Sequence, residues 1–99
     1  MDKYHVYYGT EENAYEEEFL GEFATYEQAR NCVAEYLADD FTDEGEIAKA
    51  VSEIGETGYE GENGAGYHIL YLIGERDFCL SVLYGLREDF LEQFEDEDE

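Results

Sequence analysis

The spacing of apolar residues predicts an amphipathic helix over residues 25–41. Apolar side chains recur there at intervals of three and four, which gathers them on one face of a helix with 3.6 residues per turn. They are Tyr26, Ala29, Val33, Tyr36, Leu37 and Phe41. Thr25 and Gln28 have the spacing of a capping box, so the helix is expected to start there.

Two further helices are expected after this one. Asp43 can cap a second helix with Glu46 at the box position, and Gly55 ends it. A short last helix is predicted by the helical spacing of Leu86, Phe90, Leu91 and Phe94. Residues 95–99 are all acidic and are expected to form a disordered tail.

Runs rich in aromatic and aliphatic residues predict four strands. They cover residues 4–8, 19–24, 67–73 and 78–84. The last two runs are the most apolar of the chain and flank a short polar segment, so we expect them to form a hairpin at the centre of the sheet. Gly21 indicates a bulge or a close backbone approach in the second run. The glycine-rich acidic segment 55–66 is interpreted as a flexible loop.

The resulting order ββααββα predicts an α+β domain with a mostly antiparallel four-stranded sheet and helices on one face. The 99 residues suit a single domain, expected over residues 1–94, but not two. Cys32 and Cys79 lie inside regular elements without metal or redox spacing, which is typical of core residues in a reducing compartment. Without a signal peptide or a long apolar run, the protein is expected to be soluble and cytoplasmic.

Composition adds a functional clue. The chain has 28 acidic and five basic residues and a formal net charge of −23, yet its 43% hydrophobic and 16% aromatic content favours a folded chain. A domain of this length is about 30 Å across, and duplex DNA of that length carries about 18 phosphates. Because the two charge loads are similar, nucleic acid and anionic membranes are excluded as direct partners. A basic protein surface is the expected partner.

Few residues offer catalytic or metal chemistry, so neither an enzymatic activity nor a cofactor is expected. His5 and His68 lie in predicted strands, and neither has a catalytic motif around it. The acidic segment 39–46 is similar in composition to a calcium-binding loop. With its glycine at the sixth position, however, Val51 stands where the bidentate glutamate belongs, so a specific metal site is not expected.

The carboxylates themselves are the candidate partner-binding residues. So many acids against five bases cannot alternate as salt bridges, and solubility requires a net charge of only about 2 to 8 in magnitude. The first patch is Glu11, Glu12, Glu16, Glu17 and Glu18. The second patch is Glu35, Asp39, Asp40, Asp43 and Glu44. The third patch is Glu56, Glu60 and Glu62. Tyr15 and Tyr59 stand beside two patches as expected anchors, because tyrosine is a preferred interface residue.

Two short segments carry a resemblance to a known family. Val6-Tyr-Tyr-Gly-Thr10, followed by Tyr15 and then by Leu20-Gly-Glu-Phe23, is similar to the opening of ArdA-type anti-restriction proteins. The acid-rich, base-poor, single-domain format also resembles the small anti-CRISPR and anti-restriction inhibitors of phages and mobile elements that mimic DNA. This resemblance implies a bacterial host, and a CRISPR effector or restriction-modification enzyme as the target. It assigns no role to a particular residue.

Other interpretations stay open beside this one. An acidic accessory or assembly protein could bind a basic partner without blocking nucleic acid, whereas a mimic must lose to excess duplex. Adaptation to a salty habitat also produces acidic, lysine-poor chains. A small metal-dependent or hydrolytic enzyme is a third interpretation. The oligomeric state is open as well, although repulsion disfavours association through the acidic patches.

Added salt is expected to raise the melting temperature, because it screens the repulsion among the carboxylates of the folded chain. Thermal unfolding followed by circular dichroism at increasing sodium chloride concentration measures this effect. A melting temperature that falls with salt would contradict the expectation that repulsion limits stability.

Overall fold

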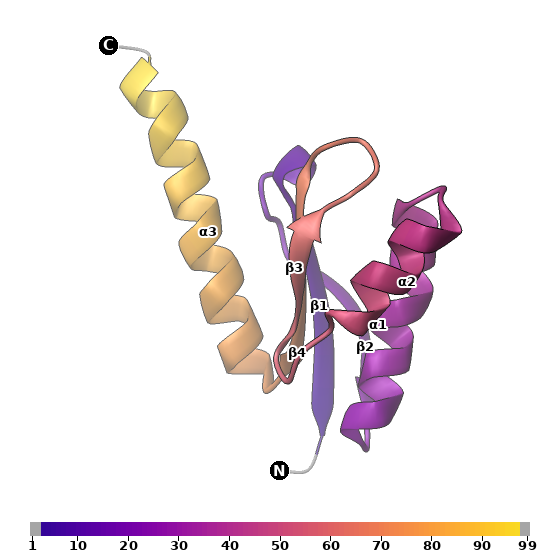
Figure 1. Cartoon of the computed structure of the whole chain (residues 1–99). Helices are drawn as coiled ribbons and strands as arrows, with labels where there is room; N and C mark the ends of the chain where they lie inside the picture. Colours follow the sequence, from indigo (N-terminus) through magenta and orange to yellow (C-terminus); the bar gives the residue numbers. More distant parts are fainter. Residues whose placement is uncertain (1–2, 98–99) are drawn as a thin grey trace.

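A computed structural model describes residues 3–97 as an antiparallel sheet with helices packed on both of its faces (Figure 1). The strands are β1 (Tyr4–Thr10), β2 (Glu18–Phe23), β3 (Gly58–Glu62) and β4 (His68–Gly74), in the sheet order β2-β1-β4-β3. The helices are the 3-10 turn η1 (Glu11–Asn13), α1 (Tyr26–Asp40), α2 (Glu44–Ser52) and α3 (Arg76–Glu97). The predicted α+β class, the four-stranded antiparallel sheet and the order ββααββα are confirmed.

The starts of α1 and α2 follow from their capping residues. Thr25 Oγ1 accepts a hydrogen bond from Gln28 N at 3.2 Å, as the sequence predicts. The Gln28 side chain accepts from Ala24 N at 3.2 Å rather than from Thr25 N. At the start of α2, Asp43 Oδ1 accepts from Gly45 N at 3.0 Å. The bonds accepted by Thr25 and Asp43 satisfy backbone N–H groups that a helix start leaves unpaired, and both helices begin where predicted.

The predicted hairpin of residues 67–73 and 78–84 is wrong. Residues 78–84 form turns of α3, and β4 pairs instead with β3, which lies inside the segment 55–66 that was expected to be a loop. A short apolar run does not distinguish a strand from a buried helix by its pattern alone. Cys79 and Leu83 are four residues apart and both are fully buried, which is the helical spacing within that run.

Glycine allows β3 to pair with β4. Gly58 has a φ of +122°, and a Cβ atom there would collide with the backbone carbonyl of Tyr71. The strand carries one buried apolar side chain, that of Tyr59, among glycines and glutamates. Because such a strand has no apolar alternation, its sequence is typical of a loop.

Helices cover both faces of the sheet, so the prediction of helices on one face is wrong. The first core, between the sheet and α1 with α2, includes Val6, Val33, Leu37, Ile69 and Tyr71. The second core, between the sheet and α3, includes Tyr7, Leu70, Leu72, Cys79 and Leu83. Residues Ile69–Ile73 of β4 are all buried, which is typical of a strand packed on both faces. Assigning residues 78–84 to the sheet shortens the predicted last helix, which lacks the turns that carry Cys79 and Leu83 into the second core.

Three smaller predictions can also be compared with the structure. The pairing of β1 with β2 shifts register beside Gly21, so the predicted irregularity is confirmed. Cys32 and Cys79 are free and pack at the first and second cores, as expected. Helix α3 continues into the segment 95–99 that was expected to be a disordered tail, and residues 98 and 99 lie outside the described residues.

Replacing Leu83 by alanine is expected to lower the free energy of unfolding by about 2–5 kcal/mol, because it opens a cavity where α3 packs on the sheet. Tyr67→Ala, at an exposed aromatic residue before β4, is the control and should change it by no more than about 0.5 kcal/mol. Urea denaturation measures both changes. Equally small effects would show that α3 does not form a core with the sheet.

Candidate functional site

The topology gathers three acidic segments at one end of the molecule, the upper end in Figure 1. β1 and β3 end there, and β2 and β4 begin there, because neighbouring strands are antiparallel. Helix α1 also ends there, since the backbone carbonyl of Asp40 accepts from Gly64 N at 2.9 Å. We call this region the carboxylate end. Its acids are Glu11, Glu12, Glu16, Glu17, Glu18, Asp39, Asp40, Asp43, Glu44, Glu60 and Glu62.

The segments that form the carboxylate end contain no lysine or arginine. The basic residues of the sequence are Lys3, Arg30, Lys49, Arg76 and Arg87. Lys3 pairs with Glu22 at 3.1 Å, and Arg30 donates to the Val51 carbonyl at 3.0 Å. Those two cations are therefore engaged away from the carboxylate end.

Two of the predicted acids lie outside this end. Glu35 lies on α1 one turn before Asp39, so it extends the second patch along the helix. Glu56 precedes β3, and the strand then runs from there towards the carboxylate end. The third predicted patch is therefore divided, with Glu56 at one end of β3 and Glu62 at the other.

Tyr15 and Tyr59, which were expected to be anchors for a partner, are instead buried. The two residues are only 8% and 7% exposed. Tyr59 belongs to the first core, and the Tyr15 ring packs edge-on against Phe90 at a centroid distance of 5.9 Å. Ala14 and Tyr15 have φ values of 59° and 58°, which cost roughly 1 kcal/mol or more each outside glycine. This strained turn accompanies the inward position of the Tyr15 ring, and neither tyrosine projects from the surface as an anchor.

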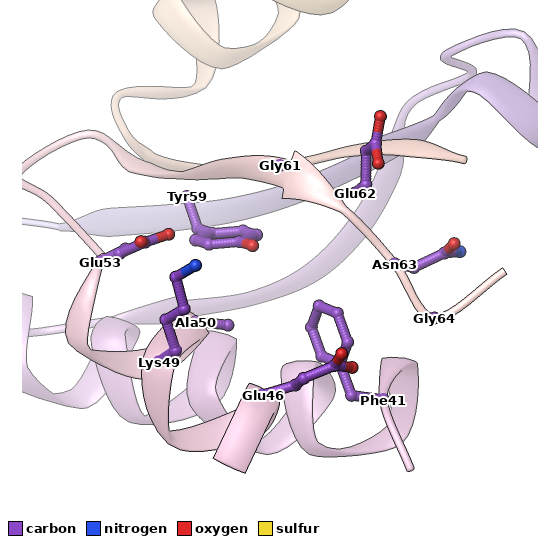
Figure 2. Close-up of a pocket in the computed structure, with 10 residues that line it drawn as sticks. All are labelled: Phe41, Glu46, Lys49, Ala50, Glu53, Tyr59, Gly61, Glu62, Asn63 and Gly64. Atoms are coloured by element: carbon purple, nitrogen blue, oxygen red, sulfur yellow. The ribbon is translucent and has the colours of Figure 1, made fainter. Parts of the chain in front are cut away.

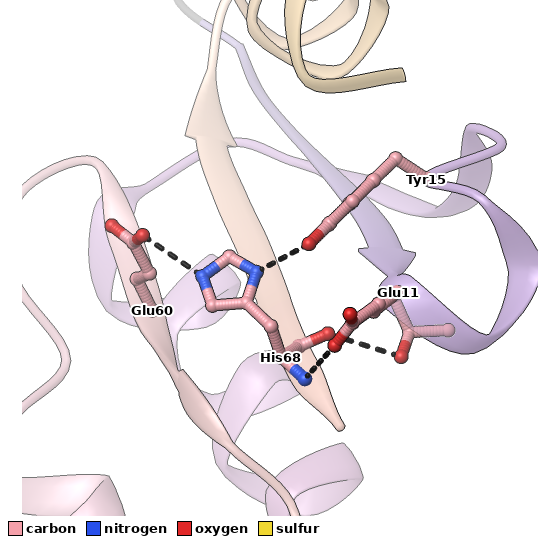
Figure 3. Close-up of polar contacts among 5 residues, drawn as sticks. Glu11, Tyr15, Glu60 and His68 are labelled. Atoms are coloured by element: carbon pink, nitrogen blue, oxygen red, sulfur yellow. Dashed lines mark hydrogen bonds and ion pairs between the residues drawn. The ribbon is translucent and has the colours of Figure 1, made fainter. Parts of the chain in front are cut away.

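His68 joins the first and third acidic patches (Figure 3). Its Nδ1 atom lies 2.9 Å from the Tyr15 hydroxyl, and its Nε2 atom lies 2.9 Å from Glu60 Oε2. In the neutral ring with its proton on Nε2, Tyr15 donates to Nδ1 and Nε2 donates to Glu60. The backbone N–H of His68 donates to Glu11 Oε1 at 3.3 Å. One residue therefore positions two carboxylates from distant parts of the sequence.

Asp40 is held by a tyrosine from the first core. The hydroxyl of Tyr71 donates to Asp40 Oδ2 at 2.6 Å. Partial burial raises the pKa of Asp40, the hydrogen bond from Tyr71 opposes this rise, and the charge of Asp39 adds to it. Burial, followed by the interactions with Asp40, also raises the pKa of Tyr71. The hydroxyl therefore stays protonated and remains a donor at neutral pH.

Glu17 is held from the opposite face of the sheet by α3. The hydroxyl of Tyr84 donates to Glu17 Oε2 at 2.6 Å, and this hydrogen bond is the main cause of a lowered pKa of Glu17. The charges of Arg87 and Arg76 lower it further. Five of the eleven acids at the carboxylate end thus accept hydrogen bonds from protein donors: Glu11, Glu17, Asp40, Asp43 and Glu60.

A pocket lies beside the carboxylate end, between α2 and β3 (Figure 2). Tyr59 lines it from β3, and Lys49 extends from α2 towards that ring. Glu46, Glu53 and Glu62 make its lining predominantly anionic. The lining includes no serine, cysteine or histidine, so the pocket lacks the usual pairing of a nucleophile with a histidine base.

The described residues contain neither a metal-binding cluster nor a membrane-spanning helix, and comparison with known proteins finds no match. Within the described part of the chain, no three histidine, cysteine, aspartate or glutamate side chains are grouped to hold a metal ion. None of the helices in residues 3–97 has both the length and the apolar character of a membrane span. No protein-family model, curated protein or solved structure matches the chain.

The sequence does not reveal the donors that hold the carboxylates. Tyr71 and Tyr84 lie in apolar runs, where hydrophobic spacing carries no information about a hydroxyl group. His68 stands at the start of a strand, where a structural histidine is the ordinary interpretation. The high tyrosine content was the available signal. Tyrosine content predicts contact surface, but at these positions tyrosine donates to the chain's own acids.

Tyr84→Phe is expected to raise the pKa of Glu17 towards its ordinary value, because the hydrogen bond to the ionised carboxylate is lost. A lowered pKa in the folded state stabilises the protein above the pKa of the unfolded chain. The stability difference between wild type and variant should therefore be present at neutral pH and vanish as pH falls through the folded pKa. Carboxyl-carbon NMR titration measures the pKa. Tyr67→Phe is the control, and an unchanged Glu17 titration in Tyr84→Phe would show that the hydrogen bond is absent.

Proposed function

We propose that this protein is a DNA-mimic inhibitor, which occupies the basic nucleic-acid-binding surface of a bacterial defence protein and blocks DNA binding. The carboxylate end carries this proposal, because five of its eleven acids are fixed by hydrogen bonds from tyrosines, a histidine and backbone groups. Side chains that are already held lose less conformational entropy on binding than free ones do. A fixed anionic surface can therefore compete with the phosphates of DNA.

The mechanism is competition for cationic side chains. Glu35 and Asp39 lie one turn apart on α1, about 6 Å along the axis, which is on the scale of a phosphate backbone. Lysine and arginine residues that neutralise phosphates would bind such carboxylates and release counterions, with a steep loss of affinity in salt. The inhibitor needs no catalytic step, because occupying the groove is sufficient to exclude nucleic acid.

The proposed target is a CRISPR effector or a restriction-modification enzyme in the cytoplasm of a bacterial host. The acid-rich, single-domain format and the opening similar to ArdA-type proteins support this class of target. In the fold, Val6–Thr10 of that opening belongs to β1 and leads into the carboxylate end. Thr10 Oγ1 accepts from Glu12 N at 3.4 Å, so this segment also fixes the turn that carries the first acids.

Two variants that remove the same number of charges test the proposal. The first neutralises exposed acids of the carboxylate end that no hydrogen bond holds: Glu12→Gln, Glu16→Gln, Asp39→Asn and Glu62→Gln. The control neutralises exposed acids elsewhere: Glu27→Gln, Glu53→Gln, Glu56→Gln and Glu75→Gln. In bacteria that carry a CRISPR or restriction system, the wild type and the control should restore phage plating. The first variant should lose at least about tenfold of that activity, because it removes contacts to the basic groove.

Capture from lysates of the protected strain identifies the target, and excess duplex DNA should displace it. Equal losses in both variants would attribute the effect to total charge rather than to the carboxylate end. A captured protein that binds duplex DNA and the inhibitor together would instead support an acidic accessory protein.

A further inference from the structure

One flank of α3 is apolar and exposed over several turns. Tyr84 and Leu91 are each 44% exposed, and Leu80 is partly buried at the second core. These three residues follow one another at intervals of four and seven, which places them on one stripe of the helix. The hydrogen bond from Tyr84 to Glu17 brings this stripe to the start of β2, where Phe19 is 54% exposed. Exposed apolar residues therefore lie both on this flank of α3 and on the edge strand β2.

Gly85 opens a groove next to this stripe. Apart from its own turn of helix backbone, a Cβ atom added there would meet no atom of the described residues within 4 Å. Glycine in an exposed helix interior costs roughly 1 kcal/mol relative to alanine, and no close contact within the described residues requires it. With Ser81 one turn earlier, Gly85 lines an open groove that also includes Asp77 and Glu88. The missing side chain allows the backbone of a neighbouring helix to approach closely.

The charges of α3 are unevenly distributed along its length. Residues 76–87 carry two arginines and one aspartate, whereas residues 88–97 carry six acids and no base. This order opposes the helix macrodipole, which is positive at the N-terminus and negative at the C-terminus. Neither Arg76 nor Arg87 has an ion pair with another described side chain. The first half of α3 is therefore the least anionic part of the helix, and its two arginines can pair with the acids of a partner.

We propose that a second copy of this chain docks on this flank, with its α3 antiparallel to the first. The arginine-bearing half of each helix then faces the acidic half of the other. Each acidic C-terminus also meets the positive end of the neighbour's macrodipole. A parallel pair would instead align two sets of six acids.

The two proposals are tested at different residues, although the hydrogen bond from Tyr84 to Glu17 links the flank to the carboxylate end. Gly85, the residue replaced to test self-association, belongs only to the groove. Failure of the phage-plating test would therefore leave this proposal unchanged, and a monomeric protein would leave the proposed inhibition unchanged.

Sedimentation velocity of the wild type and of Gly85→Gln tests the proposal. The wild type should show a concentration-dependent dimer. The variant should dimerise at least about tenfold more weakly, because its side chain fills the groove. The space around Gly85 is open and glutamine favours helix, so the variant monomer should fold with an undiminished melting temperature. Gly45→Gln, at an exposed glycine near the start of α2, is the matched control and should dimerise as the wild type does.

A spin-label distance measurement tests the antiparallel orientation of the two α3 helices. A spin label at Gln93→Cys, in a Cys32→Ser background, should give an interlabel distance above about 20 Å in an antiparallel pair, from the 1.5 Å rise per residue. A parallel pair would bring the labels within about 10 to 15 Å. A short distance, a dimer unaffected by Gly85→Gln, or a monomer at every concentration would each overturn the proposal. A monomer would assign the groove to another occupant, such as a basic helix of a partner.

Discussion

The whole fold depends on burying one strand on both faces, against the repulsion of a strongly acidic surface. The net charge of −23 favours expansion of the chain. The run Ile69–Ile73 of β4 opposes it by packing into both cores. Burying one large apolar side chain contributes about 1.5–3 kcal/mol, whereas two exposed charges 4 Å apart in water interact by about 1 kcal/mol, and by less in salt. Concentrating apolar residues at the sheet centre therefore allows the periphery to be anionic.

Tyrosine connects this interior to the charged surface. The ring of Tyr71 lies in the first core while its hydroxyl holds Asp40. Tyr15 packs against Phe90 while its hydroxyl contacts His68, which in turn binds Glu60. A buried phenol needs a hydrogen-bond partner, and a carboxylate at the rim of the core is a strong acceptor. The same side chains thus stabilise the core and restrict the acids above it.

The sequence predicts this structure where a residue pattern has one physical meaning. Apolar spacing and the cap at Thr25 locate α1, because few other structures satisfy both. The run 78–84 fits a strand or a buried helix equally well. In the structure it is a helix that covers the second face of the sheet, and no local pattern shows that this face needs cover. The sequence pattern does not predict β3, because the pairing of this strand depends on the close approach of Gly58 to β4. The acidic patches are visible as composition, but their convergence around His68 depends on strand register, which no local pattern specifies.

The state of the carboxylates bears on the choice between mimicry and adaptation to salt. A solvating carboxylate needs only exposure to water, and fixing it costs side-chain entropy without improving solubility. At the carboxylate end, Glu17 and Asp40 are fixed from opposite faces of the sheet by tyrosine hydroxyls. A strained turn at Ala14 and Tyr15 helps to build the same end, and retained strain at a surface is a reason to infer function. Ordered carboxylates on segments that contain no basic residue cost entropy without improving solubility. They suit a surface that meets cations in a defined geometry.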